Sequence, residues 1–143
     1  MGVVVDSSVF IAAERGRFDW IGFHSQIGSE LLFLTSVTLA ELMHGVERAD
    51  SPERRAARLQ FVSEIEARYP LLSFARQEAL EYASLWARLG ASGTLIGTHD
   101  LLIAAIARTH DFRVATLNVG EFNRVPNLEV MDASAFRLST RKN

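Results

Sequence analysis

Three acidic side chains lie where a sheet protein could use them for chemistry. Asp6 ends a Val-Val-Val run, Glu41 lies in the middle of a helical segment, and Asp100 lies in the first turn of a strongly apolar one. A carboxylate that ends a buried strand is partly desolvated, which costs free energy unless something compensates. If the three converge, two unit charges 4 Å apart repel by about 4 kcal/mol at an effective dielectric constant of 20. Raised pKa values or a bound divalent cation would relieve that repulsion.

The available ligand types decide which metal such a site would take. The chain has no cysteine, which excludes thiolate catalysis, cysteine-ligated zinc and iron–sulfur clusters. Oxygen ligands favour Mg²⁺ or Mn²⁺. A carboxylate–histidine site is an alternative, because His44 follows Glu41 by one turn and His99 adjoins Asp100, but the HExxH spacing of zinc enzymes is absent. Walker A, GxGxxG and GxSxG motifs are absent as well.

Each acid also has an ordinary structural interpretation. Asp6 could cap the helix that follows it, although Ser7 and Ser8 already offer caps, so the aspartate is surplus to that role. Asp100 lies where any helix favours an acid, and Glu41 could be a solvated helical glutamate. The expected fold favours a site, because ligands of open α/β sheets bind beyond the carboxyl ends of the strands, near a topological switch point.

The elements that must position these residues alternate along the chain. We expect strands at 3–5, 31–34, 71–74, 114–117 and 128–131. We expect helices at 7–13, 20–27, 37–48, 52–69, 77–89 and 98–108. This alternation predicts an α/β fold with a central parallel sheet of about five short strands, flanked by helices on both faces.

Length and composition indicate one globular domain over residues 1–143, and the lack of a targeting or membrane segment predicts a cytoplasmic protein. The net charge of -2 does not suit a chain that simply coats nucleic acid. Setting the three candidate acids aside leaves 14 of the 17 acids against 15 bases, so the total does not argue against such a substrate. Arg54, Arg55 and Arg58 form a solvated helix face or touch phosphate or a protein partner.

Four blocks of sequence occur in a recognisable order. They read VVDSSV at 4–9, SVTLAELMHG at 36–45, IGTHDLLIAA at 96–105 and ATLNVGEFNRVPNL at 115–128. Together they resemble the PIN domain, and they are most similar to the VapC toxins of bacterial toxin–antitoxin pairs. The resemblance covers nearly the whole chain and implies the PIN-like (Rossmann-like) variant of the α/β fold.

The resemblance implies a Mg²⁺-dependent endoribonuclease toxin, with Mn²⁺ able to substitute, that cleaves structured RNA such as a tRNA or ribosomal RNA loop through a metal-activated water. Asp6, Glu41 and Asp100 match the family's catalytic, metal-binding acids. The fourth acidic position falls at Asn118, which brings an oxygen ligand but no charge, and Glu121 is near enough to replace it. Whether one or two metals bind therefore stays open.

Further expectations follow from the same resemblance. Ser8 and Thr116 match hydroxyl positions that hydrogen-bond the acids and orient them. The implied partners are a VapB-like antitoxin, whose C-terminal segment occludes the acidic site, and a second copy of the toxin within a larger complex.

Two alternatives to a nuclease stay open. One is a non-catalytic interaction module of the same fold, which the uncharged Asn118 favours. The other is a phosphatase or phosphoacceptor with an acidic pocket. Ser8 stands where haloacid-type phosphatases need a second aspartate, and Lys142, the only lysine, lies at the tail instead of near the last strand, where receiver domains need one.

Overall fold

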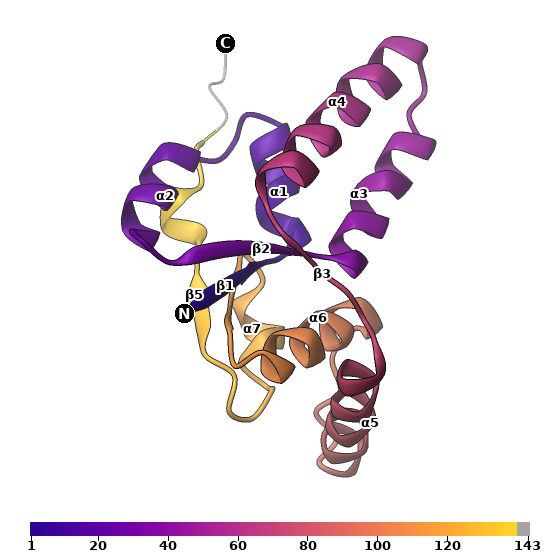
Figure 1. The fold of residues 1–143 in the computed structure, drawn as a ribbon, viewed down its shortest axis with the longest axis vertical. Coiled ribbons are helices and arrows are strands. Elements are labelled where there is room, and N and C mark those ends of the chain that lie inside the picture. Colours follow the sequence, from indigo (N-terminus) through magenta and orange to yellow (C-terminus); the bar gives the residue numbers. More distant parts are fainter. Residues whose placement is uncertain (140–143) are drawn as a thin grey trace.

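A five-stranded parallel sheet forms the middle layer of the structure, a computed structural model that describes residues 1–139 (Figure 1). Its strands are β1 (Gly2–Val5), β2 (Leu31–Thr35), β3 (Leu71–Leu72), β4 (Arg113–Thr116) and β5 (Val130–Asp132). Their order across the sheet is β3-β2-β1-β4-β5, and every neighbouring pair is parallel. The predicted α/β fold with about five short parallel strands is confirmed.

Helices fill the connections and cover both faces of the sheet. They are α1 (Ser7–Glu14), α2 (Trp20–Ile27), α3 (Ser36–Glu47), α4 (Pro52–Arg68), α5 (Arg76–Ala91), α6 (Thr98–Thr109) and α7 (Val119–Phe122), and a 3-10 turn (Ser134–Phe136) follows β5. In Figure 1, α1 to α4 lie on one side of the sheet and α5 to α7 on the other. The six expected helices are present, whereas the short α7 was not expected. None of the helices in residues 1–139 combines the length and apolarity that crossing a membrane requires.

The Val-Val-Val run of β1 is buried on both faces of the sheet. Side chains alternate along a strand, so Val3 and Val5 join the apolar core with α1 to α4, while Val4 joins the core with α5 and α6. All three valines are fully buried, and each contributes about 1.5–3 kcal/mol through burial. This packing fixes the position of the residue that follows, Asp6.

The strand order places a topological switch point between β1 and β4. The chain proceeds from β1 through β2 to β3 on one side of β1, and β4 and β5 then fill the other side. Val5 pairs with Ala115, so the residues after β1 and at the end of β4 lie side by side. Crevices for ligands form at such points in open α/β sheets.

Helix α6 reaches the same edge of the sheet because its body is anchored in the interior. Five consecutive residues of α6 are fully buried, namely Ile103, Ala104, Ala105, Ile106 and Ala107. The helix packs against α5 and β4, which confirms its predicted interior position and holds its first turn, with Asp100, near the sheet.

Candidate metal centre

Asp6 lies directly after β1 and is fixed by two hydroxyl groups. Only 2% of its surface is exposed. Ser8 Oγ and Thr116 Oγ1 both donate to its Oδ2 atom, at 2.7 and 2.9 Å. The backbone N–H groups of Leu117 and Asn118 donate to Ser8 Oγ and Thr116 Oγ1 at 3.1 and 2.8 Å, so both hydroxyls are themselves oriented. The carboxylate is thereby held in one orientation at the end of β1.

The prediction that Ser7 or Ser8 caps helix α1 is wrong. The helix begins at Ser7, Asp6 occupies the N-cap position, and no side chain forms a cap hydrogen bond there. The two serines donate to the acids instead, because Ser7 Oγ reaches Glu41 Oε2 at 2.9 Å while Ser8 reaches Asp6. Ser7 is therefore a site residue that the sequence analysis missed. The sequence did hold a signal for this role, because a helix start needs only one capping side chain and the chain has two adjacent serines there.

Glu41 lies in α3 and faces the same site. Its Oε2 atom accepts the Ser7 hydrogen bond, whereas Oε1 is buried and has no hydrogen-bond partner within residues 1–139. Burial raises the pKa of Glu41, the Ser7 bond opposes that rise, and the charge of Asp6 adds to it. His99 Nδ1 lies 3.8 Å from Oε1, beyond hydrogen-bond distance. A buried carboxylate oxygen without a partner is costly, so this atom is well placed to contact a cation.

Asp100 holds the opposite side of the site. Burial raises its pKa to about 8, together with a hydrogen bond to Glu121 and the negative charges of Asp6, Glu121 and Glu41. The same hydrogen bond lowers the pKa of Glu121. Asn118 Nδ2 donates to Asp100 Oδ2 at 3.3 Å. The fold thus brings all five predicted acid and amide positions to one edge of the sheet.

The arrangement fits a divalent cation in its chemistry. The donors are carboxylate and amide oxygens, which Mg²⁺ and Mn²⁺ prefer, Glu41 Oε1 has no partner, and neighbouring negative charges raise the pKa of Asp100. Within the described residues, no three His, Asp or Glu side chains form a group that could already hold an ion. The carboxylates would therefore have to draw together around a cation.

The metal-free protein should lose stability as the pH rises towards 8, because of the raised pKa of Asp100. The unfolded chain releases the Asp100 proton near pH 3.8, whereas the folded chain keeps it up to about pH 8. The folded state therefore binds more protons between these values, so its stability is greatest at the acid end and falls as the pH approaches 8.

Asp100→Asn should remove this loss. Asp100 is partly solvated, so screening reduces the effect, and we expect the variant to melt about 2–4 °C higher than the wild type at pH 8 in EDTA. The two proteins should differ little at pH 5. Thermal denaturation across this range checks the prediction, and equal pH profiles would contradict it.

The hydroxyl groups that orient Asp6 should affect activity more than stability. Thr116→Val keeps the side chain's shape and removes one hydrogen bond to Oδ2, and Ser8→Ala removes the other. Loss of such an orienting bond typically lowers metal affinity or activity about 10–100-fold. Mn²⁺ titrations and cleavage rates would measure both effects, with Ser134→Ala, which changes a serine after β5, as the control. Wild-type rates in both site variants would contradict the orienting role.

Comparison with known proteins agrees with the fold. A sequence model of the PIN domain matches residues 3–128, so the chain belongs to the PIN domain family. The protein named Ribonuclease VapC from Rickettsia bellii is 36% identical over 131 residues, covering 92% of this chain and 96% of its own. The tRNA(fMet)-specific endonuclease VapC of Shigella flexneri is 35% identical over 132 residues, covering 92% and 97%. Within the PIN domain family, this chain is therefore a member of the VapC group.

A solved structure supports the same assignment. The crystal structure of DNA-bound VapBC from Salmonella typhimurium contains a chain that superposes with a TM-score of 0.81 at 27% identity, covering 92% of this chain and 98% of that one. The resemblance to PIN domains of the VapC type, expected from four blocks of sequence, is confirmed.

Proposed function

We propose that the protein is a divalent-metal-dependent endoribonuclease toxin that a VapB-like antitoxin neutralises. The observation that carries the proposal is the edge of the sheet where Asp6, Glu41 and Asp100 meet, with Glu41 Oε1 buried and without a partner in the described residues. Full-length relatives named ribonuclease VapC support RNA as the substrate. Solved VapBC complexes support an antitoxin as the partner.

In this proposal, each site residue has a distinct role. Asp6, Glu41 and Asp100 would hold Mg²⁺ or Mn²⁺, with Asn118 or Glu121 as a further oxygen ligand. When bound, such an ion polarises a phosphoryl oxygen and lowers the pKa of a water molecule. Because burial and neighbouring negative charges raise the pKa of Asp100, a bound cation would favour its ionised form.

The hydroxyl-bearing residues position these acids. Ser8 and Thr116 keep Oδ2 of Asp6 in place, and Ser7 orients Glu41 through Oε2, so that Oε1 stays available. Attack of water on the phosphodiester would leave a 5′-phosphate and a 3′-hydroxyl. The catalytic assignment therefore depends on Asp6, Glu41 and Asp100, with the three hydroxyls as positioning residues.

We infer that the substrate is a structured RNA with an exposed loop, cleaved in the cytoplasm. Unstacked loop bases are the usual target of sequence-specific RNA recognition, and the Shigella flexneri relative is named for a tRNA. We further infer that two copies associate within the toxin–antitoxin complex. Leu80 and Trp86 on α5, 53% and 55% exposed, offer apolar surface for such an association.

The test is cleavage and toxicity with and without the antitoxin. Expression of the chain alone should arrest growth, and co-expression of its antitoxin should restore it. The purified protein should cut a labelled RNA hairpin in the presence of Mg²⁺, and end analysis of the products should find 5′-phosphates. Absence of both growth arrest and cleavage would contradict the proposal.

One observation favours a second candidate function, that of a non-catalytic interaction module. Asn118 stands where the resemblance to PIN domains implies an acid, and it brings no charge to the site. A protein that binds a VapB-like partner, yet binds no divalent ion and cleaves no RNA, would be such a module.

A further inference from the structure

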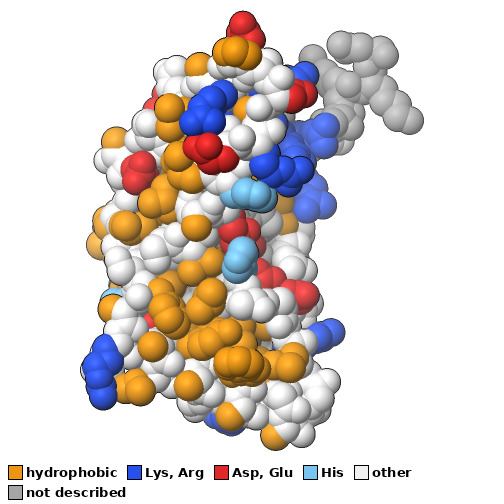
Figure 2. Space-filling view, turned by 90° about the vertical axis from the view of Figure 1, so that its right-hand side faces the viewer, with side chains coloured by type: hydrophobic (Ala, Val, Ile, Leu, Met, Phe, Trp, Pro, Cys, Tyr) orange, Lys and Arg blue, Asp and Glu red, His pale blue; other side chains and the backbone are white. Residues whose placement is uncertain are grey.

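A cavity of about 730 Å³ opens beside the acidic site, between α1, α3 and the start of α4. Its lining includes Glu41 and His99 from the acidic site as well as the arginines at positions 15, 48, 54 and 58. Figure 2 shows basic side chains gathered next to histidine and acidic side chains on one face of the molecule. The acidic site is thus continuous with a basic surface.

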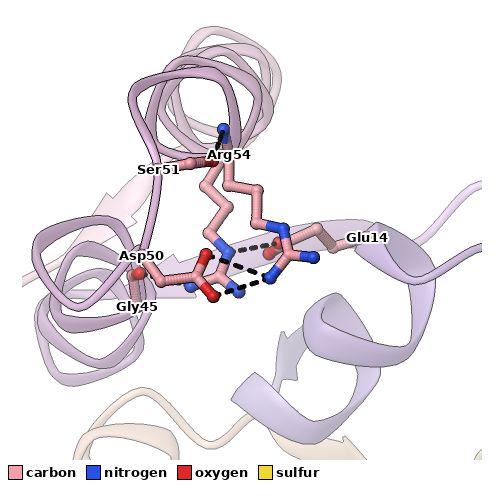
Figure 3. A network of polar contacts seen from close by, with 6 residues as sticks. Glu14, Gly45, Asp50, Ser51 and Arg54 are labelled. Carbon is pink, nitrogen blue, oxygen red and sulfur yellow. Dashed lines mark hydrogen bonds and ion pairs between the residues drawn. The ribbon is translucent and has the colours of Figure 1, made fainter.

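The three arginines that the sequence analysis singled out each have an acidic partner. The pairs are Arg54 with Asp50 at 2.9 Å, Arg55 with Glu47 at 3.0 Å, and Arg58 with Glu14 at 3.6 Å. Arg58 also donates to the Gly45 carbonyl oxygen at 2.7 Å. Figure 3 shows Glu14, Gly45, Asp50 and Arg54 close together where α1 faces the turn between α3 and α4. Arg55 and Arg58 join α4 to α3 and α1, whereas Arg54 pairs with the turn before α4, and each of the three charges has an acidic partner.

Two other arginines in the cavity lining are not engaged in this way. Arg15 and Arg48 are exposed, and neither forms a salt bridge within residues 1–139. Each is the C-cap residue of its helix, Arg15 for α1 and Arg48 for α3. A helix dipole favours a cation at that end by about 0.3–1 kcal/mol. The dipole accounts for a basic residue at each helix end, but it does not require both to line one cavity.

The same two helices connect these arginines to the acids. Asp6 immediately precedes α1, and Glu41 lies within α3. Arg48 follows Glu41 by seven residues, which is about 10 Å along the helix axis. Because α1 packs directly against α3, the spacing between acids and arginines is set by the fold.

We propose that Arg15 and Arg48 bind phosphates of the RNA strand on one side of the scissile bond. The strand then runs from the acidic site along the cavity, past the ends of α1 and α3. Guanidinium groups match phosphate oxygens with paired hydrogen bonds, and two cations outside the acidic site offset its repulsion of the strand. This inference rests on the proposed function, since it identifies how the same site holds its substrate.

The test separates binding from chemistry in the full chain supplied with Mg²⁺. Arg15→Ala and Arg48→Ala should each raise KM for a labelled RNA hairpin about tenfold and leave kcat within about twofold. The dependence of log KM on log salt concentration should become less steep by about 0.7 for each lost phosphate contact. Arg48→Lys keeps the charge without the paired geometry, so it should retain the wild-type salt slope with a KM between those of the wild type and Arg48→Ala.

Arg88→Ala is the matched control. It removes a cation from the last turn of α5, outside the cavity lining, and changes the net charge equally. KM and the salt slope should stay at wild-type values in this variant. A rise in KM as large as that of Arg48→Ala would show that net charge alone matters, which overturns the inference.

The remaining outcomes distinguish the inference from the proposed function. If the wild type cleaves the hairpin and both arginine variants keep its KM and salt slope, the inference is wrong and the proposed function stands. If the variants keep their KM for RNA but escape inhibition by the antitoxin, the cavity holds the antitoxin, which also overturns the inference. If the wild type cleaves no RNA, the proposed function fails first.

Discussion

Asp6→Asn should reduce RNA cleavage on the order of 10³-fold or more and abolish growth arrest. The asparagine has nearly the same volume, so it can occupy the buried position after β1. It removes the negative charge that a cation needs, and it replaces one of the two carboxylate oxygens with an NH₂ group, which cannot ligate a cation. Single-turnover cleavage of a labelled hairpin and growth after induced expression would measure the effect.

Asp132→Asn is the control for this substitution. Asp132 ends β5 and pairs with Thr116 of β4 through the backbone, but its side chain is exposed and its Oδ1 atom accepts the backbone N–H of Ser134. Its cleavage rate should equal that of the wild type. Circular dichroism and thermal denaturation should show that both variants are folded. Asp6→Asn protein as toxic as the wild type would contradict the site assignment.

Removing divalent cations should abolish cleavage just as completely, and the loss should be reversible. Without a cation, the negative charges of Asp6, Glu41 and Glu121 surround Asp100 and repel a phosphodiester. Dialysis against EDTA should therefore reduce the rate to background, and titration with Mg²⁺ or Mn²⁺ should restore it.

Calorimetry gives an independent measure of the same dependence. Mn²⁺ should bind to the wild type and bind much more weakly to Asp6→Asn, while Asp132→Asn should behave as the wild type does. Undiminished cleavage in EDTA would contradict metal dependence. A wild type that binds no divalent ion and cleaves no RNA would instead support the interaction module.

The sequence predicts much of the fold because its signals are local. The Val-Val-Val run, the apolar body of α6 and the alternation of strands with helices all depend on periodicity, and each is found where it was expected. The short α7 escaped prediction, since Val119–Phe122 is too brief to show a helical period. The order of the strands in the sheet could not be predicted either, because the periodicity of one segment does not indicate which distant segment it pairs with.

The position of the site at the edge of the sheet could be predicted from the sequence, but the hydrogen bonds within the site could not. Asp6 could be singled out because a charge ends a fully apolar strand. Ser7 could not be assigned to Glu41, because 34 residues separate them and only the packing of α1 against α3 brings them together. Likewise, Arg54 and Arg58 stood out as charges in the sequence, whereas only the three-dimensional structure shows that acidic partners neutralise them.

The two sides of the acidic site differ in the hydrogen bonds that hold their carboxyl groups. Two hydroxyl groups, each oriented by a backbone N–H group, donate to Asp6, while Asp100 accepts a hydrogen bond from the Asn118 amide group. On the proposed function, the carboxylates draw together around a cation, and the Asp100 side has fewer hydrogen bonds to resist that movement. One fixed and one adjustable side let a site adapt to ions of different radius. A tolerance for Mn²⁺ in place of Mg²⁺ would then be a mechanical property of the fold as well as a matter of ligand chemistry.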